Sequence, residues 1–212
     1  MKRSNKRPSR KAKRSALKPS RYEIRLAGSG GQGIITAARI LAEAISAGGE
    51  KYVCQTQSYG PEARGGASKA EIVVSYEPID YPKAMNPDLL LAMNQTSCDS
   101  YFSDLKPYGL LIVDSTLVRQ IPISRAVALP FTDIAREKIG KELVANMVAL
   151  GAVVRLSQVV APGIAEEVIA QKVPKAFVEM NIKAFNAGIE AASQVDIDAL
   201  PASAFSSEEE EL

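Results

Sequence analysis

The pattern of hydrophobic and polar positions predicts short strands interleaved with helices. Apolar and polar residues alternate over residues 22–27 and stop at Gly28, which indicates a strand that ends in a tight turn. Apolar residues then recur at helical spacing over residues 34–47, and a pair of glycines ends that run. The apolar runs 88–94 and 109–114 are continuous, as in strands that are buried on both faces of a parallel sheet.

The remaining segments complete an α/β order. Strands are expected at 51–57, 67–76 and 126–129, and helices at 95–105, 132–139, 142–157 and 174–193. This order predicts the α/β fold class: a three-layer, Rossmann-like domain with a mostly parallel sheet and no second core.

The composition narrows the class of protein. The chain has 212 residues, of which 46% are hydrophobic, enough for one well-buried domain. The longest apolar run, 143–154, is too short to span a bilayer and indicates a buried helix. It contains Asn146, which is interpreted as a buried amide with its hydrogen bonds satisfied. No secretory signal follows the basic N-terminus, and Cys54 and Cys98 stand too far apart for a disulfide framework. We therefore expect a soluble, reduced, cytoplasmic protein with no membrane contact.

Two absences restrict the chemistry. The chain has no histidine, the commonest general base and metal ligand. Its two cysteines cannot supply the four thiolates that an iron–sulfur cluster usually needs. We predict no catalytic residue, no metal ligand and no cofactor bound by this chain alone, so that any redox chemistry lies on another chain.

Charge divides the chain into three parts. Residues 1–21 carry ten lysines and arginines and no acid, which leaves 16 basic and 24 acidic residues in the remainder. We predict a basic disordered extension at 1–21, a domain at 22–194 and an acidic C-terminal tail at 195–212. The basic extension could contact nucleic acid or an acidic partner, but the acidic body makes nucleic-acid binding the less favoured function.

A glycine-rich turn follows the first strand. Gly28, Gly30 and Gly33, with Gly31 and Gln32 between them, match the G-x-G-x-x-G pattern between a strand and a helix. Such a turn lets backbone N–H groups approach an anion. A dinucleotide site also needs an acidic residue at the end of the second strand, and 54–57 contains none. Three interpretations stay open: a dinucleotide site, a turn without a ligand, and a turn that docks an anion or a partner loop.

A second polar loop follows the second strand. Glu62 could accept a hydrogen bond, while the Arg64 guanidinium suits a phosphate or carboxylate; the alternative is an ordinary turn with a local ion pair. In a parallel sheet this loop and the glycine turn share one edge, and Asn94, Gln95 and Asp114 either line that edge or cap neighbouring helices. The candidate residues of the loop are Ser58, Tyr59, Gly60, Pro61, Glu62, Arg64, Gly65 and Gly66.

These motifs together resemble the gamma chain of 2-oxoacid:ferredoxin oxidoreductases, with the 2-oxoglutarate branch the most similar. The resemblance covers residues 22–194 and leaves the basic extension outside the family pattern. It rests on residues 28–34, 55–68, 80–82, 91–95, 111–115, 130–132 and 145–151. Branched-chain, pyruvate and indolepyruvate enzymes remain alternatives, as does a free-standing nucleotide-binding protein.

The resemblance implies a fold and a division of labour. The fold is that of the gamma chain, or domain III, of pyruvate:ferredoxin oxidoreductases. Alpha and beta subunits, with a ferredoxin-like delta subunit in some enzymes, carry thiamine diphosphate and iron–sulfur clusters. They decarboxylate the 2-oxoacid, pass electrons to ferredoxin and transfer the acyl group to coenzyme A. The gamma chain is then expected to pack against alpha and to border the coenzyme A site with its glycine turn and Arg64.

Overall fold

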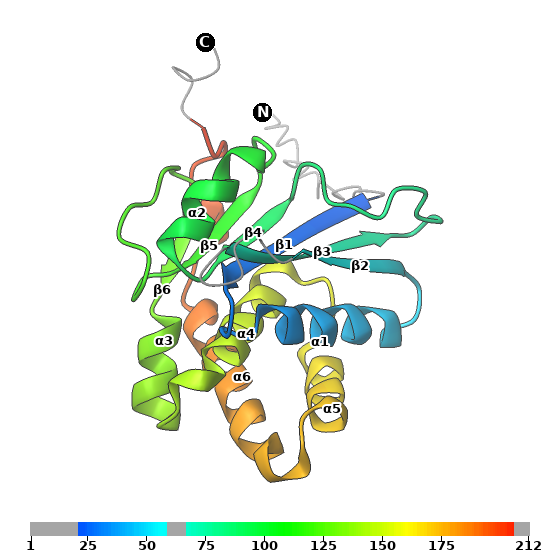
Figure 1. Cartoon of the computed structure of the whole chain (residues 1–212). Helices are drawn as coiled ribbons and strands as arrows, with labels where there is room; N and C mark the ends of the chain where they lie inside the picture. Colours follow the sequence, from blue (N-terminus) through cyan, green and yellow to red (C-terminus); the bar gives the residue numbers. More distant parts are fainter. Residues whose placement is uncertain (1–20, 59–66, 206–212) are drawn as a thin grey trace, which may run out of the picture.

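The computed structural model describes residues 21–58 and 67–205. These residues contain six strands and six α-helices, with the strands mostly in the first half of the chain and four of the helices after the last strand (Figure 1). The strands are β1 (Arg21–Ser29), β2 (Tyr52–Ser58), β3 (Ala67–Ser75), β4 (Leu89–Ala92), β5 (Leu110–Asp114) and β6 (Ala126–Leu129). The helices are α1 (Ile34–Ala47), α2 (Gln95–Tyr101), α3 (Phe131–Ile134), α4 (Ala145–Ser157), α5 (Pro162–Lys172) and α6 (Val178–Ser193).

The six strands form one mixed sheet in the order β2-β3-β1-β4-β5-β6. Pairing is parallel from β1 through β4 and β5 to β6, with Ile24 opposite Leu89 and Leu91 opposite Ile112. Strand β3 is antiparallel to both of its neighbours, β1 and β2, so those two run in the same direction as the rest. The prediction of an α/β domain with a mostly parallel sheet is confirmed.

Helices cover the two faces of the sheet unequally. Helices α1, α4, α5 and α6 pack on one face, and α2 packs on the other (Figure 1). Alternate strand residues therefore enter two separate cores, as the two-residue period of a strand requires. Ile24, Leu26, Ile72 and Leu91 belong to the larger core, whereas Ala27, Leu90, Leu111 and Val113 belong to the smaller one.

Helices α4 and α6 approach each other closely through two glycines. A Cβ at Gly151 would lie 2.0 Å from the Phe185 carbonyl oxygen, and one at Gly188 would lie 1.8 Å from the Val148 carbonyl oxygen. Any larger side chain would therefore push the two backbones apart. This contact buries α4 against α6 and explains why its apolar residues occupy more than one face of the helix.

Several helices differ in detail from the sequence prediction. Helix α5 was not expected, although Pro162 occupies its first turn, where a proline lacks no needed hydrogen bond. The segments expected as single helices at 95–105, 132–139, 142–157 and 174–193 each contain a tighter or wider turn. These turns are the 3₁₀ segments Phe102–Asp104, Glu142–Val144 and Lys175–Phe177 and the π segment Ala135–Ile139; a further 3₁₀ turn spans Ile197–Ala199.

The described part of the chain continues past both of the domain boundaries drawn from charge. Residues 195–205 pack on the domain: the Ala204 amide donates to the Pro107 carbonyl at 2.6 Å, and Ala204 is fully buried. Apolar residues such as Ile197 and Leu200 draw this segment onto the core, so the packed part of the chain continues past residue 194. Arg21 likewise belongs to β1 rather than to the extension at 1–21. Residues 1–20 and 206–212 lie outside the described residues.

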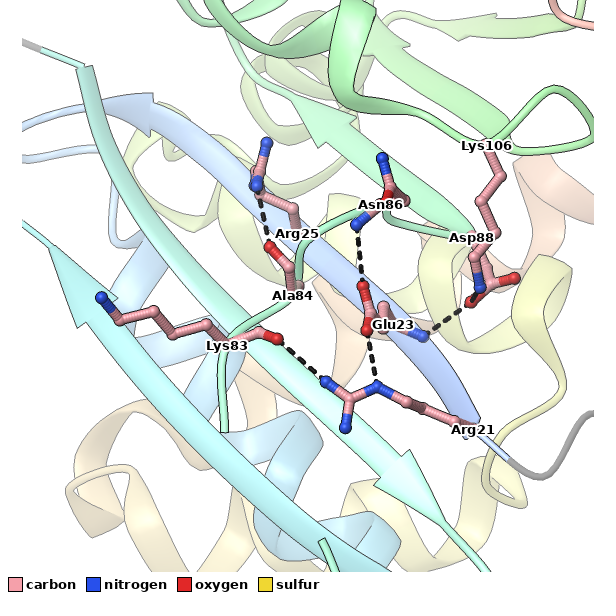
Figure 2. Close-up of polar contacts among 8 residues, drawn as sticks. All are labelled: Arg21, Glu23, Arg25, Lys83, Ala84, Asn86, Asp88 and Lys106. Carbon is pink, nitrogen blue, oxygen red and sulfur yellow. Dashed lines mark hydrogen bonds and ion pairs between the residues drawn. The ribbon is translucent and has the colours of Figure 1, made fainter. Parts of the chain in front are cut away.

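A polar network fixes the segment before β4 across β1. Figure 2 shows the side chains of Arg21 and Glu23 directed at this segment. The Glu23 carboxylate accepts from the Asn86 amide at 3.0 Å and pairs with Arg21 at 2.6 Å, while Arg21 also donates to the Lys83 carbonyl. The Glu23 amide donates to Asp88 at 2.8 Å. The network satisfies buried polar groups and aligns the start of β4 beside β1.

A buried arginine continues this network on the same face. Arg25 is 3% exposed, pairs with Glu71 at 2.9 Å and also with Asp104. Its guanidinium donates to the Ala84 carbonyl and lies 5.2 Å from the centre of the Tyr101 ring. Arg25 therefore links β1, β3, the segment before β4 and the end of α2.

Among the described residues, no helix has the length and apolar composition that a membrane span requires.

Candidate functional site at the carboxyl edge of the sheet

The carboxyl ends of the parallel strands lie at one edge of the sheet, which is where α/β folds bind ligands and partners. Ser29 at the end of β1 is opposite Ala67, and Ser58 at the end of β2 is opposite Lys69. Both strand ends therefore meet the beginning of β3 at the same edge, as expected from the sequence. Tyr59, Gly60, Pro61, Glu62, Arg64, Gly65 and Gly66 lie outside the described residues.

The glycine turn presents bare backbone at this edge. Gly31 and Gly33 have positive φ values of 90° and 74°, which residues with a side chain rarely adopt. Gly30 and Gly31 are exposed, and no atom lies within 4 Å of the position that a Cβ would take at either. Gly33 caps the N-terminus of α1, where the first amides have no partner within the helix. The turn therefore offers open space and backbone donors to an anion or to a partner's carbonyl groups.

Gln32 braces the turn internally. Its Oε1 accepts from the Ser29 amide at 2.7 Å, and its Nε2 donates to the Met93 carbonyl at 3.2 Å. The Asn94 amide group donates to the same Oε1 at 3.2 Å. Gln32 thus ties the end of β1 to the end of β4, and its side chain supports the turn rather than extending from it. Gly28, beneath this side chain, has no room for a Cβ, which would lie 2.8 Å from Oε1.

Asn94 and Gln95 hold the neighbouring helix and loop. Asn94 Oδ1 accepts from the Ser97 amide at 2.8 Å and so caps α2. Gln95 Oε1 accepts from the amides of Arg119 and Gln120 at 2.9 and 3.0 Å. Of the two roles considered from the sequence, helix capping is observed for Asn94. The structure brings Asn94 to Gln32 but directs Gln95 toward the loop after β5.

Asp114 is fully buried at the end of β5. Its carboxylate accepts from the Thr132 hydroxyl at 2.5 Å and amide at 3.2 Å and from the Thr116 amide at 3.0 Å. These bonds attach the start of α3 to the sheet, so Asp114 also acts as a cap. Burial raises the pKa of the Asp114 carboxyl above its usual value, and the hydrogen bonds from Thr132 and Thr116 oppose that rise.

Asn146 supports the turn from α4. Its Nδ2 donates to the Gly33 carbonyl at 3.1 Å, and the residue is 7% exposed. The interpretation of Asn146 as a satisfied buried amide is confirmed. This bond also fixes the N-cap residue of α1 relative to α4.

A hollow of about 260 Å³ adjoins the turn and was not expected from the sequence. Leu143, which is 78% exposed, and Leu117, which is 40% exposed, stand on its rim. The sequence assigned Leu143 to a buried helix, but Glu142–Val144 forms a 3₁₀ turn that leaves its side chain outside. The lining of the hollow comprises Gly31, Gln32, Met93, Leu117, Thr132, Glu142, Leu143 and Ala145.

The sheet order argues against a dinucleotide site. In a dinucleotide-binding fold the second parallel strand lies beside the first and carries the acidic residue that holds the ribose. Here antiparallel β3 occupies that place and moves the end of β2 one strand further away. The last residues of β2, Cys54 to Ser58, also contain no acid.

The described side chains of this edge suit binding more than bond-making. Gln32, Asn94 and Asp114 are engaged in internal hydrogen bonds. Burial and the nearby Asp99 carboxylate raise the pKa of the Cys98 thiol to about 11, so its thiolate is scarce near neutral pH. What the edge supplies is a row of backbone donors beside a small apolar hollow.

Comparison with known proteins agrees with this architecture. The sequence model of the family "Pyruvate ferredoxin/flavodoxin oxidoreductase" matches residues 23–191. The KorC subunit of 2-oxoglutarate synthase from Methanocaldococcus jannaschii is 46% identical over 179 residues, which are 82% of this chain and 96% of that protein. The corresponding subunit from Methanothermobacter marburgensis is 49% identical over 181 residues, or 80% of this chain and 96% of that protein.

A crystal structure extends the agreement to three dimensions. The gamma subunit of a keto/oxoacid ferredoxin oxidoreductase from Geobacter sulfurreducens is 46% identical and superposes with a TM-score of 0.75. The match covers 85% of this chain and 99% of that chain. On the extent of these matches, the chain belongs to the pyruvate ferredoxin/flavodoxin oxidoreductase family.

Proposed function

We propose that this chain is the gamma subunit of a 2-oxoglutarate:ferredoxin oxidoreductase. The observation that carries the proposal is its identity of 46–49% to two KorC subunits of 2-oxoglutarate synthase along 96% of their length. In this role the chain binds alpha and beta subunits and contributes no catalytic side chain of its own.

The carboxyl edge of the sheet supports a binding role. Gly30 and Gly31 leave the turn open, so a partner's backbone or an anionic group can come close to the amides at the start of α1. Leu143 adds an exposed apolar side chain beside them, of the kind that anchors protein interfaces. We assign this edge to the contact with the alpha subunit.

The same turn fits the phosphate groups of coenzyme A. A phosphate matches backbone donors at a helix N-terminus, and the turn has room because it carries no side chains at Gly30 and Gly31. Arg64 and Glu62, which follow Ser58 in the sequence, are the proposed side-chain contacts beyond the end of β2: Arg64 for a phosphate or carboxylate, and Glu62 for a hydrogen-bond donor. Thiamine diphosphate and iron–sulfur clusters on the partner subunits supply the decarboxylation and the electron transfer to ferredoxin.

Anaerobic co-purification tests the assignment. The full chain, tagged at its C-terminus, is recovered from native extract, and the partners are identified by mass spectrometry. Coenzyme A-dependent dye reduction is then measured with 2-oxoglutarate, pyruvate, 2-oxoisovalerate and indolepyruvate. Alpha and beta partners with activity on 2-oxoglutarate are the expected result.

The other outcomes have distinct meanings. Activity confined to another oxoacid would keep the subunit role and replace the substrate. A chain recovered without partners after gentle crosslinking would overturn the subunit role and return attention to the glycine turn as an independent ligand site.

A further inference from the structure

A larger cavity lies at the opposite, amino edge of the sheet. Its volume is about 570 Å³, within the range of small-molecule sites, and a second hollow of about 320 Å³ adjoins it. The two hollows share Lys51, Tyr76, Gln158 and Val159 in their linings. The walls come from the end of α1 and the residues between α1 and β2, the start of β1, the end of β3, the end of α4 and the start of α5.

The lining of the larger cavity combines apolar and cationic groups. Its apolar wall consists of Ile45, Val154, Val159, Val160, Pro162 and Ile164. Lys51 and Arg155 supply two positive charges against the single carboxylate of Glu50. Within residues 21–58 and 67–205, neither Lys51 nor Arg155 forms an ion pair. The cavity therefore has an excess of positive charge beside an apolar surface.

Lys51 is held where the two hollows meet. Its Nζ donates to the Val159 carbonyl at 2.5 Å and lies 5.8 Å from the centre of the Tyr76 ring. An ammonium group has three donors, and this carbonyl accepts from one of them. The lysine is thus positioned by the fold while it retains donors for a ligand.

Two further features mark the same wall. Ser157 Oγ, in the lining of the smaller hollow, is buried and has no hydrogen-bond partner among the described residues. An orphaned buried hydroxyl costs free energy, which a ligand acceptor would recover. The next residue, Gln158, has a φ of 54° and is the left-handed C-cap that ends α4 at the cavity.

From this arrangement we propose that the cavity binds a small organic anion, a carboxylate attached to a short apolar chain. The carboxylate contacts the Lys51 ammonium and the Ser157 hydroxyl, with Arg155 adding to the positive potential. The apolar chain lies against the wall formed by α1, α4 and α5. The basic residues at 1–20 carry the same sign of charge as these cations and are therefore not the occupant.

Hexanoate is a suitable probe because it has one carboxylate and a short chain. The full-length chain, labelled with ¹⁵N, is titrated with sodium hexanoate and, separately, with hexylammonium chloride, which reverses the charge. The expected result is saturable shifts at Lys51, Ser157, Gln158 and Ile164 with hexanoate and none with hexylammonium. Lys51→Met, which keeps most of the aliphatic stem, should weaken hexanoate binding about tenfold, the effect of losing one charge-assisted hydrogen bond.

A cavity-filling variant tests the proposal independently, in case Lys51→Met does not fold. Gly48 lines the cavity at a φ of −69°, and a Cβ there would meet only ordinary contacts, the nearest at 3.4 Å. Gly48→Leu should therefore fold and abolish binding. Gly163→Leu is its size-matched control, because no atom lies within 4 Å of a Cβ at that position. Shifts scattered over the surface, or equal hexanoate binding by the native chain and Gly48→Leu, would overturn the proposal.

Discussion

Asn146 fills the space into which a side chain at Gly33 would project. Its Nδ2 would lie 2.4 Å from a Cβ at Gly33, and the same nitrogen donates to the Gly33 carbonyl at 3.1 Å. Gly33 also has a φ of 74°, so its backbone and its surroundings both exclude a side chain. The start of α1 is therefore fixed by a pair of residues that are 113 positions apart.

Alanine should destabilise the fold strongly at Gly33 and hardly at all at Gly30. Gly33→Ala should lower the free energy of unfolding by about 2 kcal/mol or more, through the positive φ and the clash with Asn146. Gly30→Ala should stay within about 0.5 kcal/mol of the native chain, because its Cβ enters open space. Urea denaturation measures both.

The clash itself can be separated from the backbone strain. Asn146→Ala combined with Gly33→Ala removes the contacting amide, so the double variant should recover part of the loss relative to the sum of the two single variants. Strict additivity of the single variants would contradict the role given to this contact.

The buried Arg25 should matter far more to stability than an exposed arginine with two acidic partners. Arg25→Met leaves Glu71 buried without its main counter-charge, and we expect a loss of about 3–5 kcal/mol in the free energy of unfolding. Arg136, whose side chain is 54% exposed, pairs with Asp133 and Glu142 at the surface. Arg136→Met is the matched control and should leave the denaturation midpoint near that of the native chain. Equal midpoints for the two variants would refute this view of Arg25.

Asp114 should make the free energy of unfolding fall as the pH rises, whereas a carboxylate whose pKa is lowered by folding makes it rise. Burial raises its pKa in the folded chain above the ordinary value of 3.8. As the pH rises between these two values, the unfolded chain loses a proton that the folded chain retains, and stability falls. Asp114→Asn removes this titration, so the stability difference between the native chain and this variant should narrow as the pH rises.

Urea denaturation of both chains from about pH 4 to pH 6 measures this difference, because other groups titrate alike in both. If the stability difference between the native chain and Asp114→Asn widened as the pH rose, the pKa of Asp114 would be depressed by folding rather than raised.

The exposed Leu143 should contribute to assembly and not to folding. Leu143→Ser should reduce co-purification of the alpha subunit, while the free energy of unfolding of the isolated chain changes by less than about 0.5 kcal/mol. Tyr108 is 76% exposed at the amino edge of the sheet, so Tyr108→Ser is the control and should leave assembly intact. Undiminished recovery of alpha with Leu143→Ser would remove the hollow beside the turn from the interface.

Local periodicity was sufficient to predict much of the fold. It located α1 at residues 34–47 and the buried strand that ends at Asp114, because each has a clear and uninterrupted pattern. Periodicity did not predict helix α5, because its buried residues, Ala165, Val168 and Ile169, are few among polar neighbours. Periodicity also could not give the direction of β3, which depends on pairing with distant strands.

The candidate site was predictable in its residue types but not in its contacts. The glycine turn and the polar strand ends are visible in the sequence. That Gln32 and Asn94 bond to each other, while Gln95 reaches the loop after β5, depends on how the strands assemble. Leu143 appeared as the first residue of a buried apolar run, and only the 3₁₀ turn before α4 leaves it at the surface.

The antiparallel strand β3 sets the spacing between the carboxyl ends of β1 and β2. Because it stands between β1 and β2, the ends of those strands are two strand spacings apart, or about 9.6 Å. A single phosphate cannot span that distance. Under the binding role proposed for this edge, an extended molecule or a partner's loop would contact the chain beside Ser29 and again beside Ser58, which would fix its orientation as well as its position.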